Sequence, residues 1–259
     1  MITSVQNTRV QHIRALQSRA KARREASSFV VEGVRLAEEV LAAQWTVKQG
    51  FYTAGLDARG MQIVEALQDV EIDVDEVSAS VMEASSDTKT PAGLLLEVER
   101  QPLPLAATPH LVVILDRVND PGNVGTLLRS AAAAGADAAI LAPGCVDPFS
   151  PKVLRSGMGA QLRLPVLELE WDAIRSFVAE HSLHALLAEA NIGKPFDEVD
   201  LTRPLAFIVG GEANGPSDAA RTLGAEPIQI RMPGLIESLN AATAGSLLLF
   251  EAVRQRRPR

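Results

Sequence analysis

The stretch that decides the fold is Ile230-Arg-Met-Pro-Gly-Leu-Ile-Glu-Ser-Leu-Asn-Ala-Ala-Thr-Ala-Gly-Ser-Leu-Leu248. It predicts a short strand over 227–230, a turn at Pro233-Gly234, and a helix that begins after Asn240, a residue type favoured at the N-cap. Gly245 lowers helix propensity by about 1 kcal/mol relative to alanine. We therefore expect this glycine to lie very close to another part of the chain or to a ligand. Taken alone, the stretch also suits an ordinary helix buried in its own domain.

Composition indicates an ordinary globular protein and excludes several classes. The 259 residues allow one large or two modest domains, and 47% of them are hydrophobic. We expect no membrane span and no signal peptide, because no apolar run is long enough. The single cysteine, Cys145, excludes an internal disulfide, suits a reducing cytoplasm and is expected to act as a small buried side chain. The four histidines lack the spacing of metal ligands, so we expect no metal.

The first 24 residues carry positive charge only. Apolar residues recur at helical spacing (Val5, Val10, Ile13, Leu16), which predicts a basic helical arm. A solvated helix face and a phosphate-binding face are both open readings of this arm. The formal net charge of −7 argues only mildly against a nucleic-acid partner, since the distribution of charge matters more than its sum. The basic residues of the arm are Arg9, Arg14, Arg19, Lys21, Arg23 and Arg24.

The remaining pattern divides into two α/β units with a proline-rich linker at 101–109. In the front unit, residues 1–100, we expect strands at 29–31 and 94–98 and helices at 34–43 and 61–67. In residues 110–259 we expect strands at 111–115, 138–141, 185–187, 205–209 and 227–230, and helices at 124–134, 171–180 and 216–223. Continuous apolar strands that alternate with helices predict a mostly parallel sheet covered on both faces. Ligands of such sheets bind at the carboxyl ends of the strands.

Two more loops that follow predicted strands carry polar residues and glycines. In 116–129, Asn123 could simply cap the next helix, while Arg129 is either a surface cation or a clamp for phosphate or carboxylate. In Val209-Gly-Gly-Glu-Ala-Asn-Gly-Pro216 the glycines allow close approach to a ligand, and Glu212 stands among them. This loop lacks the Lys-Ser/Thr of a P-loop, and Gly157-Met-Gly159 fails as a dinucleotide fingerprint. A doubly wound nucleotide-binding enzyme is therefore disfavoured.

Taken together and in this order, the three loops resemble the SpoU/TrmH family of RNA ribose 2′-O-methyltransferases, within the SPOUT class. The resemblance rests on Asn123 through Arg129, on Gly210-Gly-Glu-Ala-Asn-Gly215, and on Ile230, Met232 and Gly234 followed by Ser238-Leu-Asn240. Asp147-Pro-Phe-Ser-Pro-Lys152 and the residues at 155–160 are similar to the same family. More weakly, Phe29-Val-Val-Glu-Gly33 resembles the family's ribosomal-protein-like RNA-binding domain.

The resemblance implies a deep trefoil knot in the C-terminal domain, a homodimer, and S-adenosylmethionine bound in the knot loops. It places Gly210, Ile230 and Leu239 around the adenosyl part, with Gly211, Met232 and Gly234 in the same loops. Catalytic and substrate-site roles are implied for Asn123, Arg129, Glu212, Ser238 and Asn240. RNA contacts are expected from the basic arm together with Lys152 and Arg155.

The function predicted from the sequence is therefore methylation of a ribose in structured RNA in the cytoplasm, with ribosomal RNA favoured because of the extra N-terminal domain. A transfer-RNA substrate is an alternative. A second alternative is a non-catalytic RNA-binding or ribosome-assembly protein on the same fold, although such a protein would have no physical need for Arg129, Glu212 and Asn240 together.

Overall fold

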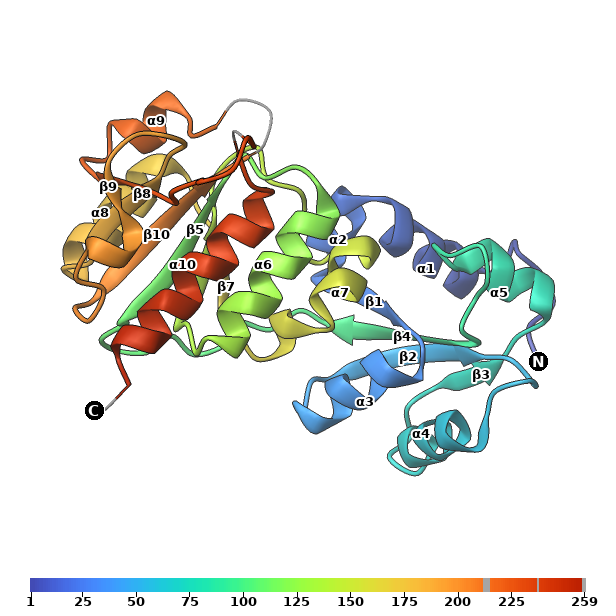
Figure 1. The fold of residues 1–259 in the computed structure, drawn as a ribbon. Coiled ribbons are helices and arrows are strands. Elements are labelled where there is room, and N and C mark those ends of the chain that lie inside the picture. Colours follow the sequence, from blue (N-terminus) through green and yellow to red (C-terminus); the bar gives the residue numbers. More distant parts are fainter. Residues whose placement is uncertain (212–214, 237, 258–259) are drawn as a thin grey trace. The chain divides into compact units, whose positions relative to one another are not determined.

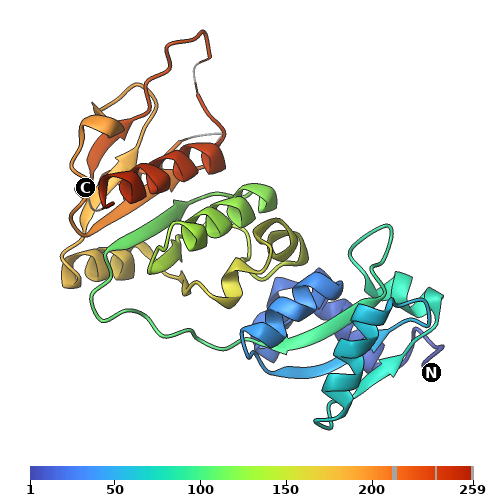
Figure 2. The same ribbon diagram turned by 60° about the horizontal axis from the view of Figure 1, so that its bottom comes forward.

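The computed structural model describes residues 1–211, 215–236 and 238–257, and Figures 1 and 2 show its course. The chain forms two compact units. The N-terminal unit consists of Met1–Pro102 together with Phe149–Leu162, and the C-terminal unit consists of Leu103–Pro148 together with Arg163–Arg259. No helix among the described residues is both long and apolar enough to cross a membrane.

The N-terminal unit is built on a four-stranded mixed sheet in the order β1-β4-β2-β3. Strand β4 is antiparallel to β1 and β2, and β3 is parallel to β2. Figure 1 shows α1, α2 and α5 on one face of this sheet and α3 and α4 on the other. The elements are α1 (Thr8–Ser18), α2 (Ala20–Ala26), β1 (Ser28–Glu32), α3 (Val34–Ala42), β2 (Val47–Tyr52), α4 (Ala58–Gln68), β3 (Val74–Glu76), α5 (Ala79–Ser85), β4 (Leu94–Glu99), α7 (Pro151–Gly157) and the 3-10 helix η1 (Ala160–Leu162).

The helical spacing predicted for the basic arm is confirmed in α1. Val10, Ile13 and Leu16 are fully buried in one apolar cluster with Phe51 and Met82. The arm is nevertheless two helices, because Arg19 adopts an extended conformation and separates α1 from α2. The apolar face of α1 thus holds the arm on its sheet.

The segment 149–162 completes the N-terminal unit although it follows the linker in the sequence. The ring of Phe149 packs on Phe29 of β1 with 4.9 Å between ring centroids. The indole Nε1 of Trp45 donates a hydrogen bond of 3.0 Å to the carbonyl of Leu162. Part of the core of this unit is therefore supplied from the second half of the chain.

The C-terminal unit contains a seven-stranded sheet in the order β7-β6-β5-β10-β8-β11-β9, and its neighbouring strands pair in parallel. This confirms the mostly parallel sheet expected from the apolar strand runs. The elements are β5 (Leu111–Asp116), α6 (Pro121–Ala133), β6 (Ala138–Leu141), β7 (Val166–Glu168), α8 (Trp171–Glu180), β8 (His184–Ala188), β9 (Lys194–Pro195), the 3-10 helix η2 (Phe196–Glu198), β10 (Leu205–Gly210), α9 (Asp218–Arg221), β11 (Glu226–Gln229) and α10 (Ala241–Gln255).

Helices cover both faces of this sheet, and Figures 1 and 2 both show α6 and α10 side by side on one of them. The close approach expected at Gly245 is confirmed, because a Cβ atom there would collide with the side chain of Leu127 on α6. A hydrogen bond of 2.6 Å between the hydroxyls of Ser130 and Ser246 also joins the two helices. Gly245 thus allows α10 to lie close against α6.

Candidate active site

A cavity of about 540 Å³ lies at the carboxyl ends of three neighbouring strands of the C-terminal unit. Its wall is formed by the ends of β8 (188–190) and β10 (209–211), by residues at 228 and 230 around the end of β11, and by 238–241 with the first turns of α10. The position agrees with the expectation that ligands of parallel sheets bind where strands end. The volume lies within the range of about 300–1,000 Å³ that is usual for small-molecule sites.

The structure brings most of the residues predicted for the cofactor into this wall. Gly210, Gly211, Ile230, Met232 and Leu239 all line the cavity, and so do Ser238 and Asn240. Gly234 does not line it and is exposed to solvent. Glu212 lies outside the described residues.

The two glycines at the end of β10, Gly210 and Gly211, are required because other backbone segments pack directly against them. A Cβ atom on Gly210 would lie 2.6 Å from the nitrogen of Pro216, and one on Gly211 would collide with the carbonyl oxygen of Arg117. Backbone atoms cannot move aside as a flexible side chain can, so any larger residue would displace the loop. The glycines therefore allow the backbone at 117 and 216 to pack closely against the end of β10, beside the cavity.

Sequence reasoning missed Asp116, which anchors this loop. Its carboxylate is fully buried, and Oδ2 accepts a hydrogen bond of 2.5 Å from the backbone N–H of Ser217. The carbonyl of Asp116 accepts a second one of 2.9 Å from the N–H of Gly211. The sequence did contain a signal for it, because Asp116 ends a continuous apolar strand. An acidic residue that is buried in such a place almost always has a hydrogen-bond or ion-pair partner. The chain also places Glu189 and Leu248 in the cavity wall, and neither was predicted.

Asn240 confirms the predicted N-cap and reaches a second predicted residue. Its Oδ1 accepts hydrogen bonds from the backbone N–H groups of Ala242 and Thr243, at 3.0 and 3.1 Å. Its Nδ2 donates to Oδ1 of Asn123 at 2.8 Å. Both polar atoms of the Asn240 side chain are therefore hydrogen-bonded, and these bonds fix the side chain at the edge of the cavity.

The interpretation of Asn123 as a possible helix cap is wrong. Asp120 is the N-cap of α6, and its Oδ1 accepts a hydrogen bond of 2.9 Å from the N–H of Asn123. Asn123 lies in the first turn, where its side chain is available to accept from Asn240. The sequence pattern placed the start of the helix three residues too late, because Pro121 is accommodated in the first turn.

Arg129 is exposed on α6 and does not line the cavity. Its guanidinium makes no hydrogen bond or ion pair with the described residues. The charge is therefore available to a ligand or partner, which is consistent with both readings offered for it above.

The predicted RNA-binding residues all belong to the N-terminal unit, and they are not equally available. Arg9 donates to the carboxylate of Asp75, and Lys21 pairs with Glu25 at 3.6 Å. Arg23 is 6% exposed, and its guanidinium donates to the carbonyls of Leu16 and Gln17. The exposed members are Arg14, Arg19, Lys21, Arg24 and Lys152. The positive arm is thus partly neutralised by acids that follow it in the sequence.

Cys145 is a poor nucleophile in this structure. Burial raises the pKa of its thiol to about 11, and the thiol donates to the carbonyl of Leu115 at 3.2 Å. The thiol is therefore protonated at neutral pH, when only a thiolate attacks efficiently. Among the described residues there is also no group of three or more side chains able to hold a metal ion.

The family model of SpoU rRNA methylases matches residues 110–250. The chain belongs to this family. A second model, of the MRM3-like substrate binding domain, matches residues 7–96. The cavity thus lies in the part of the chain that matches the methylase model, and the basic helices α1 and α2 lie in the part that matches the substrate-binding model.

Several relatives resemble the chain over nearly its full length. An uncharacterized tRNA/rRNA methyltransferase of Synechocystis is 32% identical, covering 98% of this chain and 93% of the relative. The 23S rRNA (uridine(2479)-2′-O)-methyltransferase of Streptomyces viridochromogenes is also 32% identical, covering 98% and 92%. The crystal structure of the SpoU methyltransferase AviRb from that organism, in complex with AdoMet, superposes with a TM-score of 0.88 at 28% identity, covering 97% and 98%.

Proposed function

We propose that this chain is an S-adenosylmethionine-dependent enzyme that methylates the 2′-oxygen of a ribose in ribosomal RNA. The cavity at the ends of β8, β10 and β11 carries the proposal, because most of the residues predicted to hold the cofactor line its wall. Relatives named as 23S rRNA 2′-O-methyltransferases support a ribosomal over a transfer-RNA substrate. The substrate would place the enzyme in the cytoplasm.

The residues of the cavity fit S-adenosylmethionine. Backbone at Gly210 and Gly211 forms one side of the cavity, while Ile230, Met232 and Leu248 supply apolar walls for a purine. When bound, S-adenosylmethionine supplies a methyl group that is already activated by a positive sulfur. The protein then has mainly to position the ribose hydroxyl in line with that methyl.

We assign the positioning to Asn240, Asn123 and Ser238. The hydrogen bond of 2.8 Å from Asn240 to Asn123 links α10 to α6 at the edge of the cavity. Ser238 lines the same edge. Polar groups held in this way can orient the ribose without reorganising during the reaction.

Arg129 would grip the phosphate beside the reacting ribose and stabilise the negative charge that develops on its 2′-oxygen. The planar guanidinium donates two parallel hydrogen bonds to a phosphate, which lysine cannot do. A guanidinium with a pKa above about 12 is a poor general base, so we assign it no part in removing the hydroxyl proton.

The proposal includes the homodimer and the trefoil knot of the family. Leu247 and Phe250 of α10 expose 43% and 47% of their surface, which supports an apolar contact with a second copy. Arg129 lies on the neighbouring helix and outside the cavity of its own chain, which suits action on the cavity of the partner. Sedimentation of the wild type and of Phe250→Arg tests the dimer, and a wild-type monomer would refute it. For the knot, the supporting feature is that α10, which follows the cavity-lining residues 238–240, packs on both α6 and β10.

The test of the function uses tritiated S-adenosylmethionine and ribosomal RNA from a strain that lacks this gene. We expect label in the large-subunit RNA, a fall of about 100-fold in turnover for Arg129→Lys, and unchanged cofactor binding by calorimetry. Arg175→Lys is the matched control, since Arg175 is exposed on α8 of the same unit and donates to the carbonyl of Thr222. Cofactor binding without label in any RNA would refute the proposed reaction. Lost cofactor binding in Arg129→Lys would refute its assigned role.

A further inference from the structure

A second hollow, of about 470 Å³, lies wholly in the N-terminal unit between the C-terminal half of α1 and the end of α5. Its lining is polar, apart from small alanines, and includes no aromatic or large apolar side chain. The residues that matter here are Arg14, Gln17 and Arg19 from the α1 side and Asp87 after α5. Such a lining suits a polar ligand and not an apolar anchor of a protein partner.

Gln17 distinguishes this hollow from an ordinary surface depression. The residue is only 7% exposed and both polar atoms of its side chain are buried, yet neither Nε2 nor Oε1 has a hydrogen-bond partner. Buried polar atoms without partners are rare in folded proteins, because burial removes their water without replacing it. The amide therefore offers one donor and one acceptor side by side to a ligand that enters the hollow.

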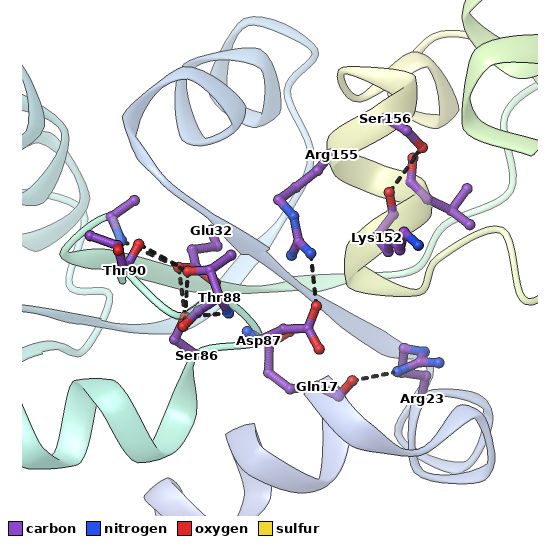
Figure 3. Close-up of polar contacts among 12 residues, drawn as sticks. Gln17, Arg23, Glu32, Ser86, Asp87, Thr88, Thr90, Lys152, Arg155 and Ser156 are labelled. Atoms are coloured by element: carbon purple, nitrogen blue, oxygen red, sulfur yellow. Dashed lines mark hydrogen bonds and ion pairs between the residues drawn. The ribbon is translucent and has the colours of Figure 1, made fainter. Parts of the chain in front are cut away.

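A second unpartnered group lies next to it. Asp87, which lines the hollow, accepts a hydrogen bond of 2.8 Å from Nη2 of Arg155 on α7, while Nη1 of Arg155 is buried without a partner. Figure 3 shows Gln17, Asp87 and Arg155 together in the N-terminal unit. The one carboxylate of the hollow is thus already paired, and the exposed Arg14 and Arg19 leave its rim positive.

We propose that this hollow binds the base of one unpaired nucleotide of the RNA substrate, with the Gln17 amide hydrogen-bonded to the base edge. The proposal rests on the RNA-methylating function above and names the part of the substrate that the N-terminal unit reads. Glutamine pairs with bases through two parallel hydrogen bonds, and unpaired bases expose the edges that such pairing needs. The guanidinium planes of Arg14 and Arg19 can stack on the base or hold its phosphates.

The first measurement is an NMR titration of the ¹⁵N-labelled full chain with AMP, GMP, CMP and UMP in turn. The side-chain amide signal of Gln17 is assigned by its absence in Gln17→Met. We expect at least one nucleotide to shift this signal and to leave that of Gln62, an exposed glutamine on α4, unchanged. Inorganic phosphate should not shift it. If no nucleotide moves the Gln17 signal, or if phosphate alone moves it equally, the proposal is overturned.

The second measurement is binding of the full chain to an unmodified transcript of large-subunit ribosomal RNA. Gln17→Met should weaken binding by about 5- to 150-fold, the usual range for losing one two-bond base contact. Gln62→Met is the matched control and should bind like the wild type. S-adenosylmethionine binding should be unchanged in both variants, and Gln17→Met should unfold at the wild-type temperature or above it, since methionine fills the volume of glutamine and removes the unsatisfied amide.

These readouts separate the possible failures. The role of Gln17 is overturned if the Gln17→Met variant binds RNA as tightly as the wild type. It is also overturned if the variant loses RNA binding and stability together. A wild type that binds no ribosomal RNA would contradict the proposed function. In that case the nucleotide titration still decides whether the hollow takes a base.

Discussion

Replacing Asn240 separates its role as a helix cap from its role at the cavity. Asn240→Ala removes the cap of α10, which is worth about 1 kcal/mol. It also removes the exposed hydrogen bond to Asn123, worth about 0.5 kcal/mol. The sum of about 1.5 kcal/mol corresponds to a fall of about 3–6 °C in Tm for a unit of this size.

Asn240→Asp keeps the cap and changes only the group that faces Asn123. Aspartate caps helices as well as asparagine does, and its charge is favourable at a helix N-terminus. We therefore expect Tm within about 1 °C of the wild type, measured by circular dichroism. Because the amide donor is lost in both variants, methyl transfer to RNA should fall by about 100-fold in both.

The control for the cap alone is Asn7, which caps α1 through an equivalent hydrogen bond of 2.9 Å to the N–H of Arg9. Asn7→Ala should lower stability by a similar amount, while cofactor binding and turnover per folded molecule stay at wild-type values. Full turnover in a stable Asn240→Asp would show that Asn240 is only a cap and would refute the positioning role.

Three further outcomes are expected. Cys145 should react with iodoacetamide at pH 8 about tenfold more slowly in the folded chain than in urea, because burial raises its pKa to about 11; equal rates would contradict this burial. Gly245→Ala gains about 1 kcal/mol of helix propensity but forces its Cβ against Leu127 at a cost of about 1–3 kcal/mol, so urea unfolding should show a net loss of up to about 2 kcal/mol, and a gain in stability would contradict the close packing. The pKa of Glu226 is lowered chiefly by its hydrogen bond from Lys194. Stability from this pair is therefore present above the ordinary pKa of glutamate and lost as pH falls through the lowered one, so Lys194→Met should be less stable than the wild type at pH 7 and equal to it in acid. A constant difference at every pH would exclude this ion pair as the cause.

Much of the fold follows from local patterns in the sequence. The buried strands of the C-terminal unit appear as continuous apolar runs because both faces of a parallel sheet are covered, and β5, β6, β8 and β10 lie within a residue or so of the predicted ranges. Strand β2 was not predicted, since Lys48 and Gln49 interrupt its apolar pattern and its stability comes from pairing with β4. The helix expected over 216–223 is only the single turn α9.

The site was predictable where it depends on backbone and only partly where it depends on contacts. Gly210 and Asn240 could be identified because glycine after a strand and asparagine before a helix each have a local physical meaning. For Asp116, its place at the end of an apolar strand signals a buried acid that has a partner, but it does not indicate which partner, because Ser217 is 101 residues away in the sequence. The neutralisation of Arg9 by Asp75 was hidden for the same reason.

The contribution of 149–162 to the N-terminal unit bears on how this protein can evolve. A domain that is one continuous piece of chain can be exchanged by recombination at its linker, but here such an exchange at 101–109 would separate Phe29 and Trp45 from Phe149 and Leu162. The two halves of the gene must therefore change together. We expect substitutions at Trp45 to be accompanied, across related chains, by substitutions at 149–162, whereas positions on the exposed face of α4 should vary independently.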